Sequence, residues 1–193
     1  MDDQLAALAG RVRAEAGRDG PAAAAHCGRL LAEAGPDELA AALTAAGEPL
    51  WAREVAAFRL GCAGDRRAFE SLVLFLNHRD PPRCAAAAHA LARLGDPRTA
   101  RAAAALATNA LRTAYAQHPV RLLAELRAPE SAPALIRTLG RLLGPHEPHW
   151  RVALACVEGL GVLGDPRARP VLTAAQSHPR LATAATAALR RLT

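Results

Sequence analysis

A short phrase built on Gly-Asp recurs along the chain and limits the folds it can adopt more than any other feature. The phrase ends one alanine-rich apolar run and starts the next, as in LARLGDPRTARAAAA and LGVLGDPRARPVLTAA. Related steps begin at Gly35, Gly64, Gly95, Arg127 and Gly164, with spacings of 29, 31, 32 and 37 residues. A period near 30 with no alternating, strand-like pattern predicts an array of helical repeats.

Each repeat is predicted to hold two helices that meet at this phrase. Glycine closes the first helix because it tolerates a left-handed turn, as expected at Gly95. Asp96 can then accept hydrogen bonds from the free N–H groups of the second helix, and Pro97 fits its first turn. The phrase therefore has a complete structural explanation as the corner of a repeat, and Asp165 is expected to act as Asp96 does.

Composition supports an all-α chain. Half of the 193 residues are hydrophobic and only 3% are aromatic, and alanine is the commonest residue, which favours helices over strands.

The 24 basic residues are all arginine. Residues 1–60 carry a net charge of −3 and residues 61–193 a net charge of +9, so the larger part could attract an acidic partner or could simply be a solubilising surface.

The segments Ala85–Ala107 and Arg151–Ala175 resemble HEAT-like repeats of the phycobilisome-lyase type. The resemblance is good at Val55–Leu76, weaker at Pro119–Leu139, where Arg127-Ala128 replaces Gly-Asp, and weakest at Ala22–Thr44. It implies a right-handed α-solenoid of about five helix pairs, with second helices on the concave face and first helices on the convex face.

The chain is accordingly predicted to be one solenoid over residues 1–193. Residues 1–47 would form a divergent N-terminal cap and first repeat, residues 48–178 the core repeats, and residues 179–193 a capping helix. The capping helices are expected at Asp3–Ala16 and Pro179–Leu192. The charged residues expected on their outer sides are Asp2, Asp3, Arg11, Arg13 and Glu15 in the first and Arg190 and Arg191 in the last. Two irregular segments, between Ala107 and Val120 and between Leu143 and Arg151, are candidates for binding loops.

Arginines of the second helices are the main candidate ligand-binding residues. Arg67, Arg98 and Arg167 share one position just after the corner, and others follow within the second helices. If those helices line a concave face, several guanidinium groups would meet one groove, which suits carboxylates or phosphates. The alternative is a solvated face with ion pairs to Glu70, Glu130 and the turn aspartates. The residues assigned to a ligand are Arg98, Arg101, Arg137, Arg141, Arg167 and Arg169.

Catalytic candidates are weak, and neither a metal nor a cofactor is predicted. Pro145-His146-Glu147-Pro148-His149 is not a zinc-binding helix motif, because proline breaks the helix and the spacing is wrong. His89 and Arg121 are unusual in first helices, and Arg121 could instead pair with Glu158 between repeats. No phosphate loop, nucleophile elbow or dinucleotide fingerprint appears. Residues worth testing for catalysis are His89, Arg121, Glu158, Tyr115 and His149.

The remaining features indicate a reduced, cytoplasmic protein. The four cysteines (Cys27, Cys62, Cys84 and Cys156) lie far apart in apolar helical patterns and are expected to be core thiols. Trp51 and Trp150 begin first helices and are expected to pack between repeats. No apolar run approaches the ~20 residues of a membrane span, and the start of the sequence does not have the pattern of a signal peptide.

Three functions fit these observations. The first is a non-catalytic scaffold that holds an acidic protein or peptide along the arginine-rich face. The second is nucleic-acid binding, as in DNA glycosylases built from HEAT-like repeats, although their Trp/Asp constellation cannot be placed on this chain. The third is a lyase or other biosynthetic enzyme acting on a small molecule, by analogy with the repeat.

Overall fold

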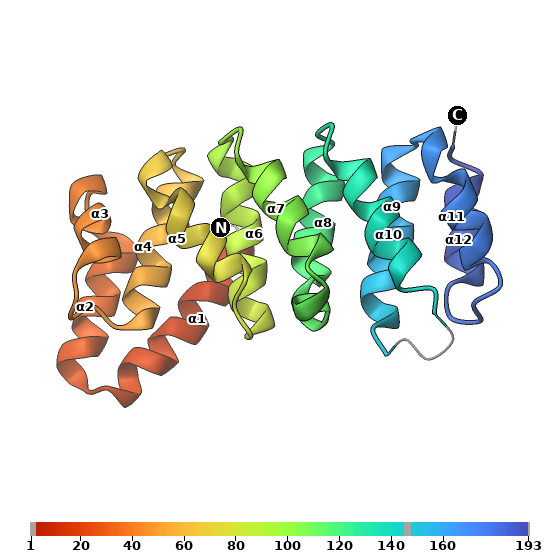
Figure 1. Cartoon of the computed structure of the whole chain (residues 1–193). Helices are drawn as coiled ribbons and strands as arrows, with labels where there is room; N and C mark the ends of the chain where they lie inside the picture. The colour runs from red at the N-terminus through yellow and green to blue at the C-terminus, as the bar shows by residue number, and fades with distance from the viewer. Residues whose placement is uncertain (1–2, 145–147, 193) are drawn as a thin grey trace. The chain divides into compact units, whose positions relative to one another are not determined.

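The computed structural model describes residues 3–144 and 148–192 and is all-α, with no β-strand in those ranges. The chain forms two compact units, residues 1–99 and residues 100–193. The first unit holds α1 (Asp3–Arg18), α2 (Pro21–Ala32), α3 (Pro36–Thr44), α4 (Leu50–Cys62), α5 (Phe69–Leu76) and α6 (Pro81–Leu94) (Figure 1). The second holds α7 (Thr99–Thr108, whose first residue belongs to the first unit), α8 (Gln117–Leu126), α9 (Ser131–Arg141), α10 (Trp150–Leu163), α11 (Arg169–Ala175) and α12 (Ala182–Leu189).

Along the described chain, helices α2 to α11 follow one another in the order of five consecutive helix pairs, as the sequence predicts: α2/α3, α4/α5, α6/α7, α8/α9 and α10/α11. Among the described residues, three short 3₁₀ helices lie in the connections: η1 (Arg66–Ala68), η2 (Ala110–Tyr115) and η3 (Pro166–Ala168). The predicted all-α solenoid of HEAT-like helix pairs is therefore confirmed as a fold class. The predicted boundaries at residues 47 and 178 stay a prediction.

Close helix contacts depend on small residues in both units. A Cβ at Gly61 would lie 2.6 Å from Leu72 Cδ1 and 3.1 Å from Ala90 Cβ, so α4 approaches α5 and α6 closely there. In the second unit, a Cβ at Gly161 would lie 3.0 Å from the backbone Cα of Ala188, which brings α10 against α12. Alanine-rich helices can pack this closely because the side chains between their backbones are small.

The corners between paired helices have the predicted chemistry. Gly64, Gly95 and Gly164 have φ angles of 79°, 65° and 68°. The side chains of Asp65, Asp96 and Asp165 accept hydrogen bonds from the backbone N–H two residues later, at 3.0, 2.9 and 2.9 Å. In each Gly-Asp step, the glycine therefore ends the first helix and the aspartate caps the start of the next.

The fourth corner, which lacks Gly-Asp, is closed differently. Arg127 takes the left-handed conformation with φ of 50°, the only non-glycine residue with positive φ in the described ranges. The buried Ser131 hydroxyl donates to the Leu123 carbonyl at 2.6 Å, which ties the start of α9 to the end of α8. The backbone at this corner therefore has the same left-handed conformation as at the three glycine corners, although its side-chain hydrogen bonds differ.

The N-terminal helix does not stack at the end of the row of pairs. Helix α1 runs across α4 towards α6 and packs against α2, α4 and α6 (Figure 1). The expectation that Arg11 and Glu15 lie on the outer side of a cap is wrong, because both side chains turn inward to ion-pair with residues of other helices. At the other end, the last helix begins at Ala182, later than the expected Pro179.

Candidate functional site

The arginines next to the corners are already paired. Arg67, Arg98 and Arg167 each fold back onto the aspartate two residues earlier, with N–O distances of 2.6 to 3.1 Å. Each aspartate thus caps a backbone N–H and binds a guanidinium group. These hydrogen bonds hold the pKa of Asp65, Asp96 and Asp165 below its ordinary value and raise the pKa of the arginines.

Two of these arginines also join neighbouring repeats of the first unit. Arg67 Nη1 lies 2.9 Å from Asp37 Oδ1 on α3, and Arg98 Nη1 lies 3.1 Å from Glu70 Oε1 on α5. The Arg98 guanidinium also lies 3.8 Å from the centre of the Phe69 ring. The alternative of ion pairs to turn aspartates and Glu70 is therefore confirmed at these positions.

Arg101 and Arg137 have a different environment. They line one groove of about 530 Å³ in the second unit, between α7 and α9. Both side chains are exposed, and neither forms an ion pair or a side-chain hydrogen bond with any described residue. One carboxylate, that of Glu130, shares the groove, so its net charge is positive. The remaining lining residues are small or apolar: Ala104, Ala105, Thr108, Pro129, Pro133 and Ala134.

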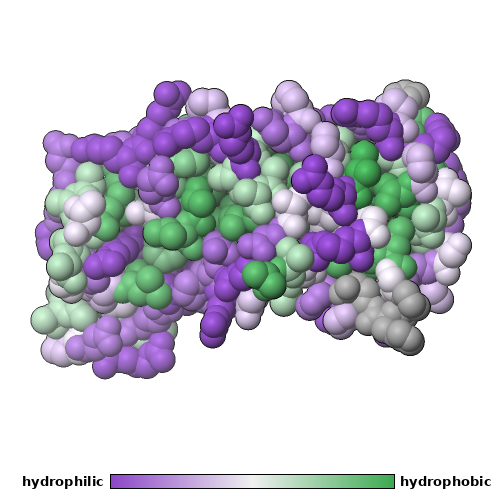
Figure 2. All heavy atoms as spheres, in the orientation of Figure 1, coloured by the Kyte–Doolittle hydropathy of each residue, from purple (hydrophilic) through white to green (hydrophobic). Residues whose placement is uncertain are grey.

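The other two predicted arginines, Arg141 and Arg169, do not line this groove. Arg141, one turn after Arg137 on α9, donates from Nη1 to the Thr113 hydroxyl at 2.7 Å and so holds η2 against the end of α9. Arg169 begins α11 and is exposed. Over the helices of the second unit, hydrophobic patches lie between hydrophilic side chains (Figure 2). Of the six predicted ligand-binding arginines, the structure therefore places two, Arg101 and Arg137, in one groove with a net positive charge.

A buried cluster of charges, which the sequence did not predict, fixes α1 to the first unit. Glu54 on α4 is 2% exposed and accepts hydrogen bonds from Arg11 on α1 and Arg83 on α6. Arg83 also pairs with Glu15 at 2.6 Å and with Asp80 at 3.4 Å. Burial lowers the pKa of Arg11, but the hydrogen bond to Glu54 and the charges of Glu54, Glu15 and Asp80 together outweigh it, so the pKa is raised. The sequence signal for this cluster was the presence of charged residues, Arg11, Glu54 and Arg83, at helix positions that face other helices.

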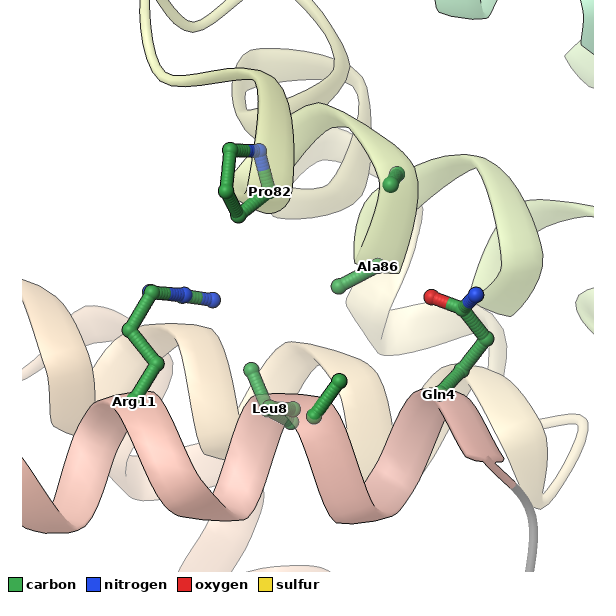
Figure 3. Close-up of a pocket in the computed structure, with 7 residues that line it drawn as sticks. Gln4, Leu8, Arg11, Pro82 and Ala86 are labelled. Atoms are coloured by element: carbon green, nitrogen blue, oxygen red, sulfur yellow. The ribbon is translucent and has the colours of Figure 1, made fainter.

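Two hollows flank this cluster. One, of about 420 Å³, lies between α1 and α6; in it Gln4, Leu8 and Arg11 face Pro82 and Ala86 (Figure 3). The other, of about 520 Å³, lies beside Trp51 and includes Glu15 and Arg83. Arg11, Glu15 and Arg83, which line these hollows, are all ion-paired within the cluster, so we assign both hollows to the packing of α1 on the first unit.

None of the catalytic candidates lines the groove or the two hollows described above. His89, on α6, stacks on Phe58 with ring centroids 5.8 Å apart. In the second unit Arg121 and Glu158 are exposed and make no ion pair with each other or with another described residue. The Tyr115 ring is covered by the Arg112 guanidinium at 4.6 Å, and His149 precedes the first residue of α10.

Other predicted features are accounted for by packing. Trp51 is buried and donates from Nε1 to Asp19 Oδ2 at 2.9 Å, as expected for packing between repeats. Cys27, Cys84 and Cys156 are buried, Cys62 is half-buried, and burial raises the pKa of Cys156 to about 12. The described ranges contain no group of three or more His, Cys, Asp or Glu side chains suited to a metal ion. Asp2, Pro145, His146 and Glu147 lie outside the described residues.

Of the helices in the described ranges, none is both long and apolar enough to cross a membrane. No family model matches the chain, and no curated protein matches its sequence. A solved structure does match: the complex of CpcE and CpcF of phycocyanin lyase from Nostoc sp. PCC7120, at 25% sequence identity and a TM-score of 0.62. The match covers 83% of this chain, which spans 66% of the length of the matched one. The phycobilisome-lyase-type HEAT-like fold inferred from the repeats is confirmed.

Proposed function

We propose that the protein is a binding module that holds an acidic segment of a partner protein in the groove between α7 and α9. The observation that carries this proposal is the contrast between two sets of arginines. Those at the corners are neutralised by an aspartate two residues away, whereas Arg101 and Arg137 share a groove in which they have no ion-pair partner among the described residues.

The chemistry of the groove suits a carboxylate ligand. A guanidinium group offers a planar fork of N–H donors, and a carboxylate can accept two of them at once. The lining of the groove is largely apolar, since five of its lining residues are alanine or proline, so it also lowers the exposure of a bound main chain to water. That the structural neighbour is itself a complex of two proteins supports a protein partner.

The test uses a fluorescein-labelled hexaglutamate peptide and fluorescence anisotropy. The double reversal Arg101→Glu/Arg137→Glu should weaken binding at least about tenfold, because it replaces both attractive charges with repulsive ones. Arg13→Glu/Arg93→Glu is the matched control: it changes net charge equally, at two exposed arginines of the first unit, and should weaken binding far less. Equal losses in the two variants would mean that only overall charge matters, and the groove proposal would be wrong.

A nucleic-acid ligand is an outcome of the same experiment. A labelled DNA duplex that binds more tightly than hexaglutamate, with an affinity that falls steeply with salt and depends on Arg101 and Arg137, would favour phosphates over a protein segment.

A lyase-related role is the second candidate, favoured by the phycocyanin lyase named for the structural neighbour. Its test adds the purified chain to phycocyanin subunits and follows their absorption spectrum. A spectral change that His89→Ala or Tyr115→Phe abolishes would support catalysis, and an unchanged spectrum with every partner tried would oppose it.

A further inference from the structure

The most exposed large apolar side chain of the described residues is close in sequence to this groove. Leu111, in η2, is 94% exposed, whereas the next most exposed, Leu74 on α5, is 73% exposed. A single exposed leucine is ordinary on a protein surface. The surroundings of Leu111 are what distinguish it.

The backbone around Leu111 is held in place by hydrogen bonds. Its N–H donates to Asn109 Oδ1 at 3.0 Å, and the Arg112 N–H donates to the Asn109 carbonyl at 3.1 Å. The Thr113 hydroxyl donates to the Ala110 carbonyl at 3.0 Å. Leu111 is therefore presented to solvent by an ordered turn, so binding through it would cost little additional backbone ordering.

The same turn is attached to the helix that carries Arg137. Thr113 is buried and accepts the hydrogen bond from Arg141, one turn beyond Arg137 on α9. On its other side, Thr108 lines the groove, and three residues span at most about 11 Å of chain. Leu111 therefore follows the last residue of α7 by three positions, within about 11 Å of chain from a residue that lines the groove, and its turn is tied to α9 through Thr113 and Arg141.

We propose that Leu111 is an apolar anchor of this site, so that the partner segment carries a large apolar side chain next to its carboxylates. This inference rests on the proposed function and specifies its partner. Arg101 and Arg137 would orient the acidic part of the segment, and burial of Leu111 against the apolar side chain would add affinity that does not depend on charge.

The experiment compares two labelled peptides: hexaglutamate followed by Gly-Ser, and hexaglutamate followed by Gly-Leu. Wild-type protein should bind the leucine peptide about tenfold more tightly, since burying one leucine side chain can supply a factor of this size. Leu111→Ser should remove this gain and leave the affinity for the serine peptide unchanged. Leu74→Ser is the matched control and should keep the gain.

The two proposals fail in different ways. If the serine peptide binds through Arg101 and Arg137 but the leucine peptide gains nothing, or gains equally in Leu111→Ser, the anchor is wrong and the arginine groove stands. If neither peptide binds in a manner that depends on Arg101 and Arg137, the proposed function fails and the anchor fails with it. A gain that persists at high salt in wild type and disappears in Leu111→Ser supports the anchor.

Discussion

Replacing Glu54 with glutamine should be among the most destabilising single changes in the first unit. The Glu54 side chain is 3% exposed and accepts hydrogen bonds from two guanidinium groups, those of Arg11 and Arg83. Glutamine has nearly the same size, so no cavity forms. The change removes the negative charge and leaves Arg83, whose side chain is 8% exposed, with the more distant carboxylate of Asp80 and that of Glu15.

The size of the effect follows from burial and from the partners that remain. Removing one member of a buried ion pair costs about 3–5 kcal/mol, because the other charge stays buried and uncompensated. Arg11 is 20% exposed and can turn towards water, and Arg83 keeps two carboxylates, so we expect the lower end, about 3 kcal/mol. For a protein of this length, that corresponds to a fall in Tm of about 6–12 °C.

The assay is urea unfolding followed by the fluorescence of Trp51 in a Trp150→Phe background, so that the signal reports the first unit alone. Glu70→Gln is the control, because Glu70 pairs with Arg98 on the surface and should contribute little. A loss of stability in Glu54→Gln no larger than that in Glu70→Gln would refute the reasoning. The apolar triple variant Arg11→Met/Glu54→Leu/Arg83→Met should be less destabilising than Glu54→Gln, since the carboxylates that lose Arg83, those of Glu15 and Asp80, are 19% and 35% exposed and can be solvated, whereas the Arg83 side chain is only 8% exposed.

Two further predictions concern the corners. Arg127→Gly should stabilise the protein by about 0.5–1 kcal/mol in urea unfolding, because glycine adopts the left-handed conformation of this position without the cost that a side chain brings; Arg121→Gly, within α8, should destabilise, and stabilisation by both would contradict the explanation. The pKa values of Asp65, Asp96 and Asp165 are lowered in the folded state, chiefly by hydrogen bonds from the paired arginines, so their contribution to stability is present above the unfolded pKa of about 4 and is lost as pH falls through the lower folded values. Unfolding measured from pH 5 to pH 2 should therefore show declining stability, with a shallower decline in Asp96→Asn, and an identical decline in that variant would be contrary to this account.

The corners could be predicted from sequence because their chemistry is local. Gly95 ends a helix and Asp96 caps the next within three residues, so the phrase itself carries the information. Even the fourth corner, where Arg127 replaces glycine, could be placed by the repeat spacing, although its closure through Ser131 could not. The packing of α1 against α4 and α6 could not be predicted in the same way. It depends on Arg11, Glu54 and Arg83, which meet only after α4 and α6 have packed, and no spacing in the sequence relates them.

The same distinction between local and long-range chemistry decides which arginines are available for binding. Arg98 and Arg101 are three residues apart, and the sequence pattern placed both on one basic face. Arg98 follows Asp96 by two residues, so the aspartate that caps its backbone N–H also binds its guanidinium group. Arg101 lies a turn further on, forms no ion pair with a described residue, and lines with Arg137 a groove that forms only when α7 and α9 pack together. The number of arginines that the sequence assigns to one face therefore overstates the positive charge that a ligand would meet. Every arginine that follows a corner Asp by two residues is neutralised, which is why the groove between α7 and α9, and not the column of corner arginines, is the surface to test.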